Sequence, residues 1–372
     1  MLKIQTYLKT HGLEKTVSDF NLILKEYDNK ILLKYNMIDS PMDKIEVQEC
    51  RGLILEKDTF NVMSMNYKRF FNHGDPLCSK VDWNSSLIQQ KIDGSMIQLY
   101  YDHIKNEWCS GTSGMADGEG EVNNNPDLTF KDLFWNTLKK YKEFNIKNLN
   151  KSLIYIFELT TPYNIVVTPH TESSLTLLTI RNKISLEEEK REYLEVYSKL
   201  LGISLVKIFD FKNKNIQTLL DTFENMPYSE EGYVVVDDKF NRIKIKNPKY
   251  LVVHRLKGRS ASHNILDIIK LNEISEFIST IPERKDELLE LKEKYDNLLV
   301  KLKYHWDKLE KPKNITKEER KKYAQNVFEI CDKNNISTFA GLYFMLIDNK
   351  ITSIEEYLIS FDNKKLYQIL LK

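Results

Sequence analysis

The sequence predicts an α+β protein in which a strand-rich first part precedes a helical last part. Over the first two thirds of the chain, short runs of β-branched and aromatic residues recur, and turn residues bound most of them. From about residue 260 the apolar residues fall three, four or seven positions apart, which is typical of a helix. This stripe consists of Leu288, Leu291, Tyr295, Leu298, Leu302 and Leu309. We therefore expect two domains, residues 1–255 and residues 256–372, of which the second is all-α.

The predicted strands of the first part are short. They are the runs at 53–55, 96–100, 153–157, 165–167, 175–180 and 233–236. Residues 242–246, Arg-Ile-Lys-Ile-Lys, alternate basic and apolar side chains, which indicates a strand with one basic face. A helix is expected over 187–201. In the last part, Thr316 and Ser353 each have a glutamate three positions later, the spacing of a helix capping box.

The composition is that of an ordinary globular protein. Of the 372 residues, 41% are hydrophobic and 29% are charged, and the formal net charge is +1. Bulk charge therefore provides no attraction to nucleic acid, so any binding must come from local patches. No apolar run approaches the roughly 20 residues that span a bilayer, and we expect no membrane association. The four cysteines are scattered without metal-ligand spacing.

The strongest local feature is the tetrapeptide Lys-Ile-Asp-Gly at 91–94, which stands between two apolar runs. A lysine at a strand end, followed by an Asp-Gly turn and a second strand, would direct its amine into a cleft. Taken alone, the tetrapeptide is more simply a solvated lysine beside an ordinary hairpin turn. The functional interpretation therefore depends on the other motifs of the chain.

Further motifs accompany the tetrapeptide in a fixed order. Upstream are Glu-Cys-Arg-Gly at 49–52 and Lys-Arg-Phe-Phe-Asn at 68–72; downstream are Phe-Glu at 157–158, Glu-Gly-Tyr-Val at 231–234 and Lys-Ile-Lys at 244–246. This order resembles that of the covalent nucleotidyltransferases, which comprise polynucleotide ligases and mRNA capping enzymes. Within that superfamily it is most similar to the bacteriophage RNA ligase 1 family. The resemblance covers residues 45–255 motif by motif, and beyond them it rests on chain length and helical character.

The resemblance implies an N-terminal nucleotidyltransferase domain of ATP-grasp-like antiparallel sheets and an ATP-dependent RNA ligase activity. Lys91 would be the nucleophile that takes AMP from ATP. AMP would then pass to an RNA 5′-phosphate, and an RNA 3′-hydroxyl would displace it. Because only the neutral amine is a nucleophile, surrounding cations would favour the reactive form of the lysine.

The types of residue in the motifs suggest individual roles. The nucleotide is expected to contact Arg51, Arg69, Phe71, Glu158, Val234, Lys244 and Lys246. Glu231 and Glu158 are expected to hold Mg²⁺, with Mn²⁺ as a substitute, because hard divalent cations prefer carboxylates. Structural alternatives stay open: Glu158 could pair with Arg181, the two lysines could protect a sheet edge, and the two phenylalanines could belong to the core.

The resemblance also implies partners. They are RNA with 5′-phosphate and 3′-hydroxyl ends, with nicked tRNA as an analogous substrate, and a polynucleotide kinase-phosphatase. A monomer in the cytoplasm, or in the host cytoplasm for a viral protein, is expected. In the helical part, a basic cluster could contact the RNA backbone or could be a solvated helix face. The cluster is Lys308, Lys311, Lys313, Lys317, Arg320, Lys321 and Lys322.

Two departures from the family pattern and two rival functions remain. Arg69 stands where the family has lysine, and residues 111–115 lack a cation that the family carries. One rival is another covalent nucleotidyltransferase, either a DNA ligase or a capping enzyme. A capping enzyme would continue into a strand-rich OB-fold, which the helical last part disfavours. The other rival is a non-catalytic nucleic-acid-binding module.

Overall fold

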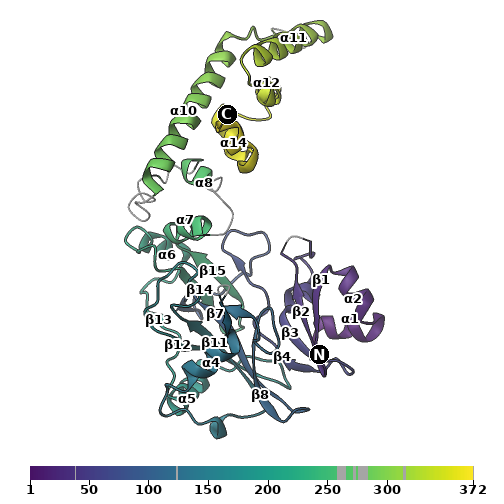
Figure 1. The fold of residues 1–372 in the computed structure, drawn as a ribbon, viewed down its shortest axis with the longest axis vertical. Helices are drawn as coiled ribbons and strands as arrows, with labels where there is room; N and C mark the ends of the chain where they lie inside the picture. Colours follow the sequence, from purple (N-terminus) through teal and green to yellow (C-terminus); the bar gives the residue numbers. More distant parts are fainter. Residues whose placement is uncertain are drawn as a thin grey trace. The chain divides into compact units, whose positions relative to one another are not determined.

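A computed structural model describes residues 1–37, 39–122, 125–257, 265–270, 274, 284–312 and 316–371. The chain divides into two compact units, Met1–Leu251 and Val252–Lys372 (Figure 1). The first unit contains three main sheets, antiparallel except for one strand pair, and the second is helical, so the predicted α+β fold class is confirmed. The boundary predicted after residue 255 falls within helix α7 (Pro248–Lys257), which begins in the first unit.

The first sheet is antiparallel, with strand order β1-β2-β3-β4. Its strands are β1 (Leu22–Glu26), β2 (Lys30–Tyr35), β3 (Arg51–Glu56) and β4 (Val62–Ser64). Three helices accompany it: α1 (Lys3–His11), α2 (Leu13–Asp19) and α3 (Ile45–Glu49). Ile4 and Leu8 of α1 are buried together with Leu33 and Leu53 of the sheet, and Figure 1 shows α1 and α2 beside β1.

The second sheet has the order β12-β11-β7-β8 and is also antiparallel. Its strands are β7 (Ser95–Asp102), β8 (Glu107–Thr112), β11 (Leu153–Thr160) and β12 (Ser174–Asn182). Alternate residues of β11 face opposite sides, as the pleat of a strand requires. Tyr155 and Phe157 join the core under the helices α4 (Phe130–Leu138) and α5 (Arg191–Leu201). Ile154 and Ile156 pack against Leu32 and Ile54 of the first sheet, so this sheet is covered on both faces.

The third sheet has the order β13-β6-β14-β15-β5, in which only the β15–β5 pair is parallel. Its strands are β5 (Phe71–Asn72), β6 (Leu87–Gln90), β13 (Ile208–Phe209), β14 (Gly232–Val236) and β15 (Arg242–Lys246). Helix α6 (Ile216–Thr222) contributes Leu219 to the core on this sheet. The remaining short elements of the unit are β9 (Glu121–Val122), β10 (Asn125–Thr129) and the 3₁₀ turn η1 (Ile146–Asn148).

Two local predictions were wrong. The run at 165–167 is not a strand, because the Val167 N–H donates to the Asp93 carboxylate instead of a neighbouring strand. The helix expected over 187–201 begins only at Arg191. Residue Glu188 is not helical, because it forms an isolated bridge with Arg181 of β12.

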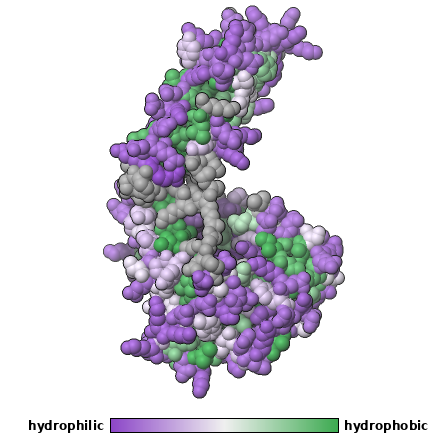
Figure 2. Space-filling view, in the orientation of Figure 1, coloured by the Kyte–Doolittle hydropathy of each residue, from purple (hydrophilic) through white to green (hydrophobic). Residues whose placement is uncertain are grey.

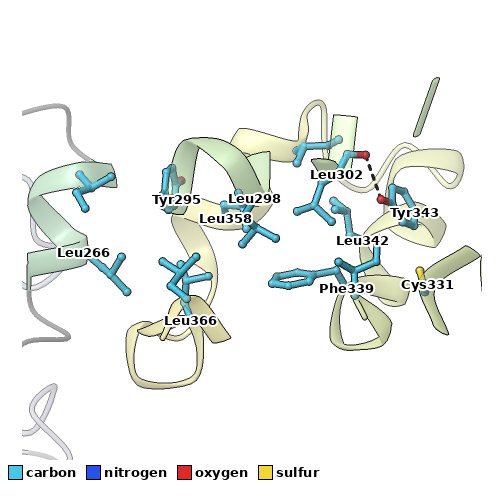
Figure 3. Close-up of a cluster of buried hydrophobic side chains, with 14 of the residues drawn as sticks. Leu266, Tyr295, Leu298, Leu302, Cys331, Phe339, Leu342, Tyr343, Leu358 and Leu366 are labelled. Atoms are coloured by element: carbon cyan, nitrogen blue, oxygen red, sulfur yellow. Dashed lines mark hydrogen bonds between the residues drawn. The ribbon is translucent and has the colours of Figure 1, made fainter. Parts of the chain in front are cut away.

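The second unit consists of helices around one apolar core (Figure 3). After α7, the helices of this unit among the described residues are α8 (Ile265–Lys270), α10 (Lys285–Lys308), α11 (Lys317–Lys333), η4 (Ser337–Phe339), α12 (Ala340–Ile347), α13 (Ile354–Ser360) and α14 (Asn363–Leu370). Every member of the predicted leucine and tyrosine stripe is buried. Thr316 and Ser353 cap α11 and α13 as predicted, since their side chains accept the N–H groups of Glu319 and Glu356.

The surface of the second unit is largely polar. Figure 2 shows hydrophilic side chains over most of its visible face, consistent with apolar residues gathered inside. Of the predicted basic cluster, Lys313 lies outside the described residues. Lys311 contacts the ring of Trp306, 4.3 Å from its centroid, and Arg320 pairs with Asp348 at 2.7 Å. Within the part of the chain that the structure describes, no helix is long and apolar enough to cross a membrane.

Candidate active site

The tetrapeptide at 91–94 joins two different sheets. Strand β6 ends at Gln90 in the third sheet, and β7 begins at Ser95 in the second. The connection is therefore not the hairpin turn that an Asp-Gly pair most often forms. The Lys91 N–H donates to the carbonyl of Gly232 at 2.9 Å, which extends the β6–β14 ladder by one hydrogen bond. The lysine thus stands where the two sheets meet.

The buried carboxylate of Asp93 holds this turn in place. It accepts hydrogen bonds from the N–H groups of Val167 at 2.8 Å and Thr168 at 2.6 Å, and from the Tyr250 hydroxyl at 2.8 Å. A ring nitrogen of His170 lies 2.9 Å from the Asp93 carbonyl oxygen. Three donors on one carboxylate fix its orientation. Neither Asp93 nor Tyr250 was assigned a role from the sequence, because Asp93 and its partners lie 74 to 157 positions apart along the chain.

Gly94 allows the turn to pass close to strand β11. A Cβ atom at this position would lie 2.6 Å from the Leu159 carbonyl oxygen and 3.0 Å from Cγ of Glu158. No side chain fits at such distances, so glycine is required here by the close approach. Glu158 shares the strand face of Ile154 and Ile156, which directs it toward the first sheet. The approach brings the Glu158 carboxylate into the electrostatic field of Lys91.

The Lys91 ammonium is held by Glu231. Its Nζ lies 2.7 Å from Oε2 of that glutamate, and Nζ of Lys246 lies 2.8 Å from Oε1. The Glu231 side chain is 5% exposed, whereas the two lysine side chains are about one fifth exposed. Gly232 has φ +128°, and a Cβ there would lie 2.2 Å from the Ile245 carbonyl oxygen. Glycine therefore lets β14 start close against β15 and places Glu231 between the two lysines.

Two titratable groups of the site have strongly shifted pKa values. Burial, together with the carboxylates of Glu231 and Asp93, raises the pKa of Glu158 to about 8, although Lys91 opposes the shift. Burial and the neighbouring cations, first among them Lys246, lower the pKa of Lys244 to about 8. An acid and a base that both titrate near pH 8 in one cluster are typical of a functional site.

A small cavity of about 60 Å³ lies beside Lys91. Four residues expected at the site, Arg51, Lys91, Glu158 and Val234, line it, together with Tyr67, Phe70, Gln89, Gln90, Ile92, Met96, Leu178, Val206 and Arg242. Leu178 is the extra residue of a β-bulge, where Ile156 and Phe157 pair with Thr179 and Leu177. Bulges next to active sites commonly redirect a side chain in this way.

Phe71 does not line this cavity, whereas Phe70 does. Phe71 belongs to β5 and is 5% exposed, with the Arg69 guanidinium 5.0 Å from its ring. The ring of Phe70 faces the cations of the site: Arg51 lies 5.2 Å and Lys244 lies 5.8 Å from its centroid. Neighbouring residues of an extended chain point to opposite sides, which accounts for the difference.

Two of the structural alternatives proposed from the sequence are wrong. Arg181 pairs with Glu188 at 3.1 Å and not with Glu158. Strand β15, which carries Lys244 and Lys246, lies between β14 and β5, so its lysines do not protect a sheet edge. Arg242 is a residue that the sequence argument missed. It is buried, pairs with Glu188 at 2.8 Å and lies 4.4 Å from the ring of Tyr67. The sequence feature that could have revealed it is the alternation of residues 242–246, which puts Arg242 on the same strand face as Lys244 and Lys246.

Comparison with known proteins identifies relatives. The family model described as RNA ligase matches residues 49–250. An RNA ligase of Rhodothermus phage RM378 is 26% identical over 385 residues, covering 84% of this chain and 85% of that protein. A putative bifunctional polynucleotide kinase/RNA ligase of Autographa californica nuclear polyhedrosis virus is 28% identical over 77% of this chain. The latter alignment covers 42% of the viral protein, so the chain corresponds to less than half of it.

Solved structures with similarity to the chain are also ligases. An archaeal ATP-dependent RNA ligase is 12% identical, with a TM-score of 0.42 over 89% of this chain and 79% of that one. A mutant RNA ligase of Naegleria gruberi, solved with ATP and Mn, is 15% identical, with a TM-score of 0.36 over 46% of this chain and 52% of that one.

Proposed function

This chain belongs to the RNA ligase family, and we propose that it joins RNA ends with ATP through a covalent lysyl-AMP on Lys91. One observation carries the assignment of the nucleophile. The Lys91 amine stands at the junction of two sheets, 2.7 Å from Glu231, and shares that carboxylate with Lys246. Such a cluster provides both the nucleophile and the cations that phosphoryl transfer requires.

The first transfer begins when the Lys91 ammonium leaves Glu231 and loses a proton. Its side chain is 22% exposed, so water can accept that proton. The amine lone pair then forms a bond to the α-phosphorus of ATP, the bond to the bridging oxygen breaks, pyrophosphate leaves, and the nitrogen releases a second proton to give the phosphoramidate. Lys244 and Lys246 lie where they can stabilise the negative charge that develops on the phosphate oxygens.

The second and third transfers return the amine and seal the RNA. An oxygen of the RNA 5′-phosphate attacks the phosphorus of lysyl-AMP, the P–N bond breaks, and Lys91 regains a proton. The 3′-hydroxyl of the other RNA end then attacks the 5′-phosphorus and loses its proton, and AMP leaves with its phosphate. Val234 and Phe70 line the cavity that would take the adenine, since both offer apolar surface there.

The two carboxylates of the site fit a divalent cation. Among the described residues no cluster of three or more His, Cys, Asp or Glu is arranged as a metal site. Mg²⁺ does not need one, because it binds through one or two carboxylates together with phosphates and water. Glu231 repels a charge on Glu158, so a cation near both would relieve the repulsion. Glu231 and Glu158 would hold Mg²⁺ or Mn²⁺, which would neutralise phosphate charge during the transfers.

The supply of 5′-phosphate ends is a further part of the proposal. The viral relative is described as combining a polynucleotide kinase with an RNA ligase. A kinase-phosphatase that prepares 5′-phosphate and 3′-hydroxyl ends is the partner whose chemistry fits this chain. Nicked tRNA as the natural substrate, a monomeric state and a cytoplasmic location stay predictions.

Protein labelling tests the proposal. The protein is incubated with α-labelled ATP or GTP and Mg²⁺ in the absence of RNA, and protein-bound label is measured. We expect label from ATP in the wild type and in Lys140→Ala, which changes an exposed lysine outside the site. Lys91→Arg should take no label although it keeps the cation beside Glu231, and only 5′-phosphorylated RNA should form circles. Label that persists in Lys91→Arg, or comes from GTP alone, would contradict the proposal.

A further inference from the structure

A second cavity adjoins the one at Lys91, and Phe70 and Arg242 line both. Its volume is about 650 Å³, in the range of sites that bind small molecules, roughly 300–1,000 Å³. Its charged lining is mostly basic: Lys68, Arg69, Arg181, Lys190, Lys239 and Arg242 stand against Glu187 and Glu188. A local excess of positive charge is notable in a chain whose net charge is only +1.

The acids of this region neutralise only part of that charge. Glu188 pairs with Arg181 at 3.1 Å and with Arg242 at 2.8 Å, and Lys68 pairs with Glu49 at 3.4 Å. The two guanidiniums hold the pKa of Glu188 below its usual range against the effect of burial.

Three cations of the cavity, Arg69, Lys190 and Lys239, form no ion pair with a carboxylate in the part of the chain that the structure describes. Three cations without a carboxylate partner around one cavity favour an anionic ligand.

An aromatic ring stands among these cations. Phe240 lies in the turn between β14 and β15 with φ +61°, a left-handed backbone that bulky residues rarely adopt. The Asp237 carboxylate accepts the N–H groups of Lys239 at 3.0 Å and Asn241 at 2.8 Å, which fixes this turn. Lys239 and Phe240 are therefore presented to the cavity by one rigid turn. A half-buried ring beside cations is suited to stacking an unpaired base.

We infer that this cavity binds the 5′-phosphorylated terminal nucleotide of the RNA strand that receives AMP, an inference that rests on the proposed function. The phosphate lies against Arg69, Lys190 and Lys239, and the base stacks on Phe240. Because Phe70 and Arg242 line both cavities, the RNA phosphate reaches the phosphorus of lysyl-AMP. One phosphate oxygen bonds to that phosphorus as the P–N bond breaks, and the amine takes up a proton.

Two other occupants fit this cavity less well. The β- and γ-phosphates of ATP offer the same chemistry, and Arg69, which is expected to contact the nucleotide, lines the cavity. The nucleophile Lys91 and the two lysines proposed to stabilise the α-phosphate, Lys244 and Lys246, do not line it. The 3′-hydroxyl end of the other strand carries no terminal phosphate. A basic lining with three cations that lack a carboxylate partner therefore favours the phosphorylated end.

The test separates the steps in the full-length protein. In the double variant Lys190→Ala/Lys239→Ala, lysyl-AMP formation is measured against ATP concentration. Single-turnover transfer of AMP from the purified lysyl-AMP protein to a short 5′-phosphorylated RNA is then measured against RNA concentration. We expect the half-saturating RNA concentration to rise about tenfold or more, with the ATP dependence unchanged. Lys140→Ala, an exposed lysine outside the cavity, should match the wild type in both.

A direct binding measurement provides a second readout. Wild-type protein should bind 5′-phosphorylated RNA more tightly than the same RNA with a 5′-hydroxyl, and the double variant should lose most of that preference. Its salt dependence should also fall, by about 0.7 in the log–log slope for each lysine that contacts a phosphate. Phe240→Asn keeps a residue that tolerates positive φ but removes the ring, and RNA binding should weaken about tenfold.

Three outcomes would overturn the inference. A raised ATP requirement with normal RNA dependence would place the β- and γ-phosphates of ATP in the cavity. A defect confined to sealing of pre-adenylated RNA would place the 3′-hydroxyl strand there. No change in any measurement would show that the cavity binds neither. If the wild type forms no lysyl-AMP, the proposed function fails, whereas the preference for 5′-phosphorylated RNA still tests the cavity by itself.

Discussion

The Lys91 ammonium and the Glu231 carboxylate lie 2.7 Å apart, at the start of strand β14. The free protein therefore holds its candidate nucleophile in an ion pair, and the amine must leave Glu231 before it can attack phosphorus. Glu231 simultaneously binds Lys246 at 2.8 Å. A nucleotide phosphate that attracts the lysines, or a cation that attracts the glutamate, would open this arrangement and release the amine.

Glu231→Gln should destabilise the protein and impair lysyl-AMP formation. The amide leaves two ammonium groups close together without a counter-charge. Removing one partner of a fully buried pair costs several kcal/mol, and the partial exposure of both lysines reduces this to about 1–2 kcal/mol. Urea unfolding measures the stability, and labelling with ATP measures the activity, which should fall more than tenfold. Glu230→Gln, at an exposed neighbour, is the matched control; an equal effect there would contradict the assigned role.

Gly94→Ala should abolish lysyl-AMP formation. The added Cβ would lie 2.6 Å from the Leu159 carbonyl oxygen, so the turn must move away from β11. Overpacking of this kind costs about 1–3 kcal/mol, seen as a lower midpoint of thermal unfolding. At Gly114 the nearest atom to an added Cβ is Nζ of Lys34, 3.9 Å away, so Gly114→Ala should leave stability and labelling unchanged. Normal labelling in Gly94→Ala would show that the close approach does not position Lys91.

Lys244→Arg should change the pH dependence of ATP use. With its pKa lowered to about 8, Lys244 loses its charge as the pH rises through that value, and its attraction for phosphate disappears. The ATP concentration that half-saturates labelling should therefore rise above pH 8 in the wild type, on the order of tenfold. Arginine stays charged, so the variant should lack this rise whatever its affinity at pH 7. A rise in the variant equal to that of the wild type would exclude Lys244 as its source.

Glu158→Gln should inactivate the protein yet make it relatively more stable at high pH. The pKa of Glu158 in the folded protein, about 8, lies above its ordinary value of 4.5. Stability from this group is therefore complete below about pH 4.5 and is lost as the pH rises through 8. Glutamine is uncharged throughout, so the variant should gain on the order of 4 kcal/mol relative to wild type between pH 5 and pH 9. Urea unfolding at pH 5 and pH 9 measures the stability of the variant relative to wild type, and Glu172→Gln, at an exposed glutamate, is the control. The same stability difference at both pH values would contradict the raised pKa of Glu158.

The motif order anticipated much of the local structure, since β3, β7, β11, β14 and β15 form at or near the expected segments. That Lys244 and Lys246 share one face of a strand could be predicted, because basic and apolar residues alternate over five positions. Which of Phe70 and Phe71 faces the cavity could not be predicted, because strand β5 has only two residues. A run that short gives no periodicity to read.

The missed residues depend on contacts between distant parts of the chain. Glu188 and Arg242 are 54 positions apart, and Tyr250 is 157 positions from Asp93. Nothing in local spacing links such pairs, and one sequence holds no record of which residues meet after folding. The chemistry-bearing types were therefore predictable, whereas the groups that orient them required the fold.

The tetrapeptide at 91–94 connects two sheets, and its reactivity therefore depends on both of them. Its lysine depends on a carbonyl from one sheet, and its glycine on a gap beside the other. A protein engineer who grafted the four residues onto an unrelated scaffold would obtain an ordinary surface amine. The tetrapeptide would have to be transferred together with the flanking strands of both sheets.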